Sequence, residues 1–278
     1  MIKFDVKKKT AQLIKWIKDY ILWSSGENGK IVINVDGSLN STVALALCTR
    51  AIGAENVVAV TIDGVYEFNQ YIMPALVVCN IPKDNIWNFD YISMDNTLEE
   101  WLPPFANKNT TIRENLFNRA VVLYLYTIAD TIGENIAKVV NTCNLSDNWI
   151  GDSVRHGNNI CDFAPLSDFT RSEVEEIGMF LGLPDLLIYG YGDNIEKTSC
   201  EKRFGITYEA LDLYIRSKVC DDEKIKAKID ELHYANIHKL KPMPKFNYRP
   251  DRIEKIIERR MMNESTSNSG HEDSGENP

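Results

Sequence analysis

The sequence predicts an α/β protein with a doubly wound, mainly parallel sheet and helices on both faces. Short apolar runs rich in β-branched residues alternate along the chain with longer segments whose apolar residues recur every three to four positions. Strands that alternate with helices form βαβ crossovers, and such crossovers produce a parallel sheet. The chain has 278 residues, 44% of them hydrophobic and 26% charged, which suffices for one large domain with a sizeable core.

The first elements follow from local patterns. Residues 9–23 carry apolar side chains with a period of 3.6 and predict an amphipathic helix. The β-branched run that starts at Ile31 predicts a strand at 31–35. A Gly/Ser/Asn turn follows, and a second helix is expected to begin at Ser41.

The rest of the chain continues the alternation. Apolar runs predict strands at 56–63, near 85–92 and at 136–142, and helices at 71–79 (despite Pro74) and 115–131. Residues 166–184 predict a further helix, with Ser167, Asp168 or Thr170 as its N-cap and with Gly182 and Pro184 ending it. We expect one domain over residues 1–262 and a disordered tail at 263–278, because the tail has no apolar side chain to bury.

Charge and composition argue against several classes of protein. The net charge is −9 and the chain has no basic stripe, so we expect no nucleic-acid partner. Its apolar runs are shorter than the roughly 20 residues of a membrane span, and the N-terminus lacks the apolar core of a signal peptide. Six cysteines are scattered without a CxxC pair, which is typical of reduced thiols in a cytoplasmic protein.

The segment "DGSLNST", residues 36–42, joins a strand to a helix N-terminus through small residues, the arrangement that holds a phosphate. It lacks the Gly-Lys-Ser/Thr ending of a Walker A loop. It also carries Asp36 where an anion would sit, and two like charges about 4 Å apart repel by several kcal/mol at an effective dielectric near 20. The alternative is that Asp36 caps the helix and satisfies the N–H groups that would otherwise bind phosphate.

Longer segments add a family resemblance. The loop is similar, offset by offset, to the pyrophosphate loop of the adenine nucleotide α-hydrolases, usually Ser-Gly-Gly-x-Asp-Ser. The segments "VVNTCNLSDNWIGDSVRHGNNICDFAPLSDFTRSEVEEIGMFLGLP", "FGITYEALDLYI" and "HKLKPMPKFNY" resemble those of ammonia-dependent NAD synthetases. The resemblance keeps the order of the segments and extends from about residue 5 to about residue 250.

The resemblance implies a fold, a reaction and an assembly. The fold is Rossmann-like, of the adenine nucleotide α-hydrolase type. The reaction is that of a carbon–nitrogen ligase: ATP adenylates the carboxylate of nicotinic acid adenine dinucleotide (deamido-NAD), and ammonia then displaces AMP. Mg²⁺ and backbone N–H groups would neutralise the phosphates. The family resemblance also implies a homodimer.

On the phosphate side, the resemblance places ATP at Asp36, Gly37, Ser38, Asn40, Ser41, Thr142, Arg171 and Asp193. The metal positions are Asn40, where the family has Asp, and Asp147, where it normally has Glu. Hard cations prefer charged oxygen ligands, so the change at Asn40 predicts weaker Mg²⁺ and ATP binding. Arg171 stands where many members have a lysine.

On the dinucleotide side, the resemblance places deamido-NAD at Arg119, Arg155, Asp162, His238 and Lys239. Simpler alternatives stay open: Arg119 as a surface salt-bridge residue, Asp162 as the cap of a turn, and His238 as a helix-end histidine. No catalytic residue is assigned.

Further departures affect the phosphate side. Asp193 replaces a small hydroxyl residue, and Cys200 replaces an acid in a loop; we interpret Cys200 as an ordinary thiol without a paired histidine. Because the dinucleotide-side residues are better kept, retained dinucleotide binding is favoured over retained ATP turnover. The first hypothesis is an ammonia-dependent NAD synthetase or a weakened form of it. The alternatives are a catalytically impaired homologue that binds dinucleotide in a regulatory or structural role, and a relative that activates another carboxylate.

Overall fold

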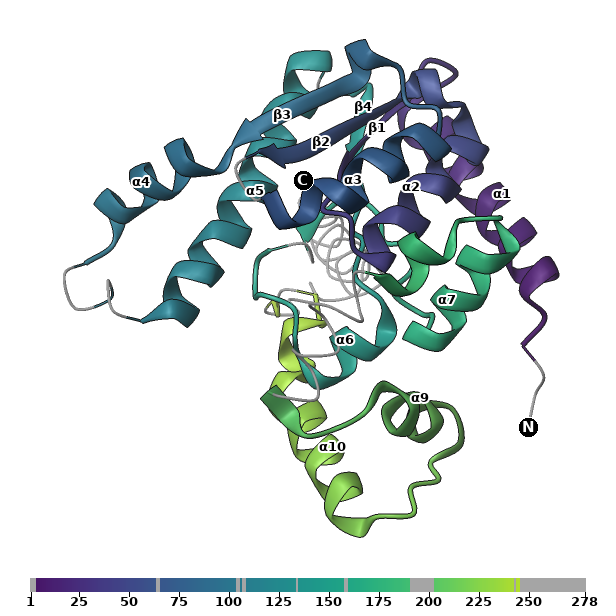
Figure 1. Ribbon diagram of the computed structural model, residues 1–278, viewed down its shortest axis with the longest axis vertical. Helices are drawn as coiled ribbons and strands as arrows, with labels where there is room; N and C mark the ends of the chain where they lie inside the picture. The colour runs from purple at the N-terminus through teal and green to yellow at the C-terminus, as the bar shows by residue number, and fades with distance from the viewer. Residues whose placement is uncertain are drawn as a thin grey trace, which may run out of the picture. The chain divides into compact units, whose positions relative to one another are not determined.

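The computed structural model of the protein describes residues 4–63, 66–103, 106, 109–133, 135–157, 160–190, 203–242 and 244–245. Its sheet contains β1 (Lys30–Asn34), β2 (Val57–Asp63), β3 (Ile86–Asp90) and β4 (Ala137–Val139). The strands lie in the order β3-β2-β1-β4, and each neighbouring pair is parallel (Figure 1). The predicted parallel sheet is therefore confirmed. The predicted strand at 136–142 is shortened to three residues, followed by a single bridge between Val140 and Phe163.

Helices connect and surround the strands: α1 (Val6–Ser25), α2 (Leu39–Ile52), α3 (Tyr66–Val78), α4 (Tyr91–Trp101), α5 (Thr110–Ile132), α6 (Leu145–Ile150), α7 (Arg171–Phe180), α9 (Tyr208–Ser217) and α10 (Glu223–Asn236). Short 3₁₀ turns lie at Ala54–Asn56, Lys83–Asn85 and Ile237–Lys239, and a π turn lies at Leu186–Gly190. The predicted helices are present, and Pro74 is accommodated within α3. Helices α4, α6, α9 and α10 were not predicted.

Alternating side chains of the strands form two separate cores. Ile31 and Ile33 of β1 point to one face, where α1, α2, α3 and α7 pack. Val32 points to the opposite face, where it joins β2, β4 and the apolar side of α5. The period of two in a strand sends neighbouring residues to opposite faces, so a sheet covered on both sides needs apolar residues at every position. Helices on both faces are thus confirmed.

The start of helix α7 is determined by a capping box. Thr170 is its N-cap: the threonine hydroxyl accepts a hydrogen bond from the N–H of Glu173, and the carboxylate of Glu173 accepts one from the N–H of Thr170. This reciprocal capping box satisfies two N–H groups at once. It selects Thr170 from the three candidate N-caps that the sequence offered.

A third apolar cluster holds α6, α9 and α10 together, with Ile150, Leu211 and Ile229 fully buried. It contains no strand residue, so these helices form a layer of their own beside the carboxyl ends of the strands. Side chains from this layer reach the loops that follow β1 and β4, as described below.

The strand order determines where a ligand site is expected. From β1 the chain continues to β2 and β3 on one side, whereas β4 lies on the other side of β1. The direction of winding therefore reverses between β1 and β4, and open α/β sheets bind ligands at the carboxyl ends of the strands at such a point. The loop at 36–38 and the segment from Asn141 to Asn144 both begin there.

Other sequence predictions are tested only in part. The chain divides into two compact units, Met1–Leu240 and Lys241–Pro278, and the predicted tail lies outside the described residues. The extent of the domain stays a prediction. None of the described helices combines the length and apolar composition needed to cross a bilayer. The five cysteines among the described residues are free, and the cytoplasmic location stays a prediction.

Candidate functional site

The loop between β1 and α2 is a tight turn. Gly37 has a φ of 83°, and a Cβ added to it would lie 2.8 Å from the Cβ of Tyr71. Only glycine combines this backbone conformation with so close an approach. The hydroxyl of Ser38 then accepts a hydrogen bond from the N–H of Ser41 at 3.3 Å and caps the helix. Helix α2 therefore begins at Leu39, two residues before the predicted start at Ser41.

The carboxylate of Asp36 is turned back into the same loop. One of its oxygens accepts hydrogen bonds from the N–H of Ser38 at 3.0 Å and from the hydroxyl of Ser41 at 2.6 Å. The N-cap itself is Ser38, so Asp36 stabilises the helix start without occupying the capping position. Two donors of a phosphate-type loop are consequently engaged by an acid of the chain.

The two predicted metal positions contact each other directly. The amide nitrogen of Asn40 donates to a carboxylate oxygen of Asp147 at 3.0 Å, although the residues are far apart in sequence. The amide oxygen of Asn40 accepts from the amide nitrogen of Asn144 at 2.9 Å. A carboxylate only accepts, which fixes the orientation of the Asn40 amide. The carbonyl oxygen that Asn40 would offer to a metal thus already has a donor.

This donor set fits one kind of Mg²⁺ site. The described residues contain no group of three or more His, Cys, Asp or Glu side chains placed to hold a metal ion. Asp147 contributes a single carboxylate, and Mg²⁺ is commonly bound by one or two carboxylates together with substrate phosphates and water. The residues therefore suit an ion that arrives with a nucleotide, with Asp147 as its charged protein ligand; the carbonyl oxygen of Asn40 joins it only if the amide turns away from Asn144.

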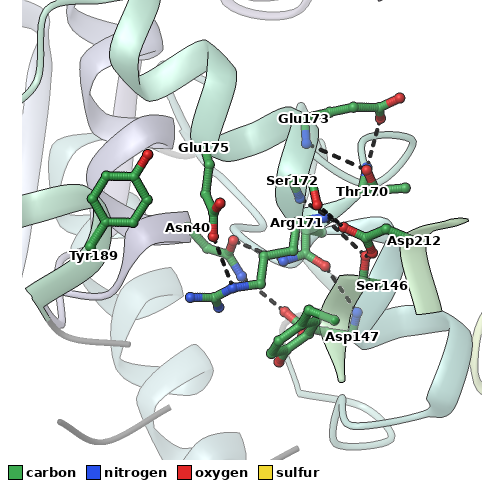
Figure 2. Close-up of polar contacts among 12 residues, drawn as sticks. Asn40, Ser146, Asp147, Thr170, Arg171, Ser172, Glu173, Glu175, Tyr189 and Asp212 are labelled. Carbon is green, nitrogen blue, oxygen red and sulfur yellow. Dashed lines mark hydrogen bonds and ion pairs between the residues drawn. The ribbon is translucent and has the colours of Figure 1, made fainter. Parts of the chain in front are cut away.

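Arg171, the first residue of α7, brings a positive charge to this region. Its side chain is buried, and its Nε lies 3.3 Å from a carboxylate oxygen of Glu175 one turn along the helix. Burial raises the pKa of Glu175, while the Arg171 charge opposes that rise. Figure 2 shows Arg171 gathered with Asn40 and Asp147. The loop residues, the metal positions and Arg171 are thus brought to one place.

Two further residues in this region were missed by the sequence analysis. The hydroxyl of Tyr208 donates to Asp147 at 2.9 Å, and its ring centroid lies 4.6 Å from the guanidinium carbon of Arg171. Asp212, one turn later on α9, accepts hydrogen bonds from Ser146 and Ser172. Both lie in "FGITYEALDLYI", a segment quoted for its family resemblance, but no local pattern in it indicates these partners.

The arginines of the dinucleotide side are brought together by a backbone contact. The Nε of Arg119, on α5, donates to the carbonyl oxygen of Arg155 at 3.1 Å, and both residues are exposed. Arg119 also lines a largely apolar cavity of about 550 Å³ between α4 and α5. The described contacts of Arg119 include no salt bridge, the simpler role considered for it.

Asp162 has a clear role within the fold. Its carboxylate accepts a hydrogen bond from the N–H of Val139 at 2.7 Å, and its own N–H donates to the carbonyl oxygen of Val139 at 2.9 Å. It therefore closes the outer edge of β4. The phenol of Tyr20 on α1 donates to its carbonyl oxygen at 3.0 Å.

Lys239, in the 3₁₀ turn after α10, contacts the loop that follows α6. Its ammonium donates to the carbonyl oxygens of Gly151 at 2.9 Å and of Ser153 at 3.4 Å. Burial lowers the pKa of Lys239, although the nearby Asp152 carboxylate opposes that shift. His238 beside it is exposed. The segment from Gly151 to Arg155 is thus contacted by Lys239 at one end and by Arg119 at the other.

The remaining predicted residues are less defined. Thr142 is half-buried. It follows the end of β4 and therefore lies at the same edge of the sheet as the loop between β1 and α2. Asp193 and Cys200 lie outside the described residues. The assignment of substrates to individual residues stays a prediction for all of them.

Comparisons with known proteins identify the family that this chain resembles in sequence. The sequence model of the NAD synthase family matches residues 9–250. The NH(3)-dependent NAD(+) synthetase of Shewanella oneidensis is 24% identical, over 87% of this chain and 92% of its own length. That of Mesoplasma florum is 26% identical, over 84% of this chain and 94% of its own length.

Solved structures share the fold. An NMN synthetase from Francisella tularensis superposes with a TM-score of 0.75 at 20% identity, covering 88% of this chain and all of that one. An NH3-dependent NAD synthetase from Campylobacter jejuni superposes with a TM-score of 0.70, also at 20% identity, with 88% and 100% coverage.

Proposed function

The chain belongs to the NAD synthase family, and we propose that it is an ammonia-dependent NAD synthetase that amidates nicotinic acid adenine dinucleotide with the use of ATP. The observation that carries the proposal is a family match over residues 9–250. Further support comes from a phosphate-type loop, a metal-capable carboxylate and a buried arginine that lie together at the reversal point of the sheet. The proposed partners are deamido-NAD, ATP and ammonia.

The reaction makes specific demands on the chain. A carboxylate oxygen of the dinucleotide attacks the α-phosphorus of ATP, and the bond to pyrophosphate breaks. The ammonia nitrogen then attacks the acyl carbon, the bond to AMP breaks, and a proton leaves the nitrogen. Because two anions must meet in the first step, the site has to supply positive charge and N–H donors where the phosphates lie.

The phosphate-side residues supply that environment. The N-terminus of α2 directs N–H groups and the positive end of its dipole toward the phosphates. Arg171 places a guanidinium in the same region and orients phosphate oxygens. Asp147 would hold Mg²⁺, together with the carbonyl oxygen of Asn40 once its amide has turned from Asn144, and the bound ion would neutralise phosphate charge. The negative charge of Asp36 repels phosphate, and its carboxylate already accepts hydrogen bonds from Ser38 and Ser41. We therefore infer a weakened ATP site.

The dinucleotide side is assigned by family resemblance to Arg119, Arg155, Asp162, His238 and Lys239. The two arginines carry permanent charge and suit a dinucleotide pyrophosphate. The carboxylate of Asp162 and the ammonium of Lys239 already hold backbone groups of the chain. We infer that these two shape the pocket as well as contact its ligand.

The function is tested by incubating the purified protein with deamido-NAD, ATP, ammonium and Mg²⁺ in excess and measuring NAD and AMP. We expect equal amounts of both products, and none when ATP is omitted. Nicotinic acid mononucleotide serves as the comparison substrate, because a relative that activates another carboxylate would amidate it faster. Binding of deamido-NAD without formation of NAD would support the impaired homologue instead.

A homodimer is the second part of the proposal. Helices α4 and α5 expose large apolar side chains, with Ile92, Trp101 and Leu123 each at least 60% exposed, and Trp101 and Leu123 line the same cavity as Arg119. An exposed apolar surface of this kind beside a ligand residue marks an interface. We expect a dimer by size-exclusion chromatography with light scattering at micromolar concentration.

A matched pair of variants tests this surface. Leu123→Glu on α5 should shift the protein toward monomer, because it places a charge in the interface. Val77→Glu on α3 changes an equally exposed aliphatic residue, 68% against 62%, away from this surface and should leave the dimer intact. A wild-type monomer, or equal behaviour of both variants, would contradict the proposed interface.

A further inference from the structure

Asp212 is a buried carboxylate that joins two helices of the candidate site. Its side chain on α9 is only 5% exposed. One oxygen accepts from the hydroxyl of Ser146, and the other accepts from the N–H of Ser172 at 2.8 Å and from its hydroxyl at 2.6 Å. Buried carboxylates require such donors, because desolvation otherwise makes the charged form costly. Three donors therefore fix Asp212 and the two serines relative to one another.

Each of these two serines is adjacent in sequence to a residue of the candidate site. Ser146 directly precedes Asp147 on α6, and Ser172 directly follows Arg171 on α7 (Figure 2). The hydroxyl of Ser146 also accepts from the N–H of Arg171 at 2.9 Å, which links the two helices without Asp212. A displacement of Asp212 would thus be transmitted to the backbone of both site residues.

Tyr208 contacts the side chains of the same two residues. It lies four residues before Asp212 on α9, and residues with this spacing share one face of a helix. Its hydroxyl donates to the Oδ1 of Asp147 at 2.9 Å, while the Oδ2 of Asp147 accepts from Asn40. Its ring lies against the guanidinium of Arg171, a cation–π contact that restricts where the charge can lie.

We propose that Tyr208 and Asp212 are positioning residues, through which α9 sets the spacing between the carboxylate of Asp147 and the guanidinium of Arg171 for Mg–ATP. The proposal rests on the proposed function, whose phosphate side these two residues form. Helix α9 is a suitable support, because Leu211 and Ile215 anchor it in the apolar cluster with α6 and α10. Groups that orient metal ligands from behind change metal affinity or activity by about 10- to 100-fold when they are removed.

The decisive experiment compares two tyrosines of the same helix. Tyr208→Phe removes a hydroxyl that donates to Asp147, whereas Tyr214→Phe removes one that donates to Asp230 of α10 at 2.7 Å. The two side chains are similarly buried, at 9% and 5% exposure. Calorimetry with Mg–ATP should show about a tenfold loss of affinity for Tyr208→Phe and a change below twofold for Tyr214→Phe.

Steady-state kinetics separate positioning from folding. For Tyr208→Phe we expect a higher KM for ATP with the KM for deamido-NAD unchanged, because none of the hydrogen bonds described above for the dinucleotide-side residues involves α9. Asp212→Asn should raise the KM for ATP more strongly, again with the KM for deamido-NAD unchanged. Ser172→Ala keeps the N–H donor and should raise the KM for ATP less. A variant that only destabilises the fold would lower kcat without separating the two KM values.

The outcomes distinguish this inference from the proposed function. Equal Mg–ATP affinities for the two tyrosine variants, or no Mg–ATP binding by the unmodified protein, would overturn the positioning role. Mg–ATP binding without any formation of NAD would instead overturn the proposed function, and the tyrosine pair would still decide the role of α9.

Discussion

The double substitution Asp36→Ser with Asn40→Asp is expected to strengthen Mg–ATP binding by about a hundredfold or more. Removing a like charge from the phosphate loop and adding a carboxylate for the metal together contribute a few kcal/mol at an effective dielectric near 20. The structure adds a second reason. Asp36 occupies the N–H of Ser38 and the hydroxyl of Ser41, and the substitution frees both donors for phosphate oxygens.

The second half of the substitution changes the metal position. The amide of Asn40 now donates to Asp147 at 3.0 Å, so an aspartate there would place two carboxylates side by side. Such a pair repels unless a cation lies between the two groups. The part of the gain in ATP affinity that comes from Asn40→Asp should therefore depend on Mg²⁺ and should disappear when the ion is chelated.

Calorimetry on the wild type, both single variants and the double variant measures this effect. The single variant Asp36→Ser should bind ATP better even without Mg²⁺, whereas Asn40→Asp should gain only in its presence. The wild type should bind deamido-NAD more readily than ATP. Tight Mg–ATP binding by the wild type, unchanged in the double variant, would show that the acid does not compete with phosphate.

The substitution Arg171→Met is expected to weaken ATP binding strongly and to lower the free energy of unfolding by about 2 kcal/mol at neutral pH. Removing one partner of a buried ion pair leaves the other charge uncompensated, at a cost of about 3–5 kcal/mol when both are fully buried. The side chain of Glu175 is 27% exposed, against 7% for Arg171, so solvent screening reduces that cost.

The loss of stability should depend on pH with a defined sign. Burial already raises the pKa of Glu175 above its ordinary 4.5, and Arg171 opposes that rise, so the variant should raise it further. A carboxyl group whose pKa is raised by folding destabilises the folded state above that folded pKa. As the pH falls through the raised pKa toward 4.5, Glu175 becomes neutral, and the difference from the wild type should shrink.

Thermal unfolding between pH 5 and pH 8 measures the effect, and Arg113→Met provides the control. Arg113 pairs with Asp95 and Glu99 between α4 and α5, but these side chains are about one-third exposed or more. Partly exposed ion pairs contribute about 0–1 kcal/mol, so this variant should remain close to the wild type. A pH-independent loss in Arg171→Met would contradict the role assigned to Glu175.

The sequence by itself determined the architecture and the family. The alternation of β-branched runs with helical periods predicts the parallel sheet, because apolar period and strand propensity are local properties of the chain. It also predicts the helix that contains α7, but it leaves Ser167, Asp168 and Thr170 as candidate N-caps, and the capping box of Thr170 with Glu173 is seen only in the structure. The small-residue loop at 36–41 and the longer family segments identified the region of the site.

Only the tertiary structure decided which side chains meet there. Asn40 and Asp147, separated by 107 positions, contact each other because β1 and β4 are neighbours in the sheet. Tyr208 and Asp212 reach the site because an apolar cluster packs α9 against α6. Periodicity indicates the face that a residue occupies but not the element that covers this face. The sequence therefore located the loop and its acid, and the packing of distant elements determined what each polar side chain binds.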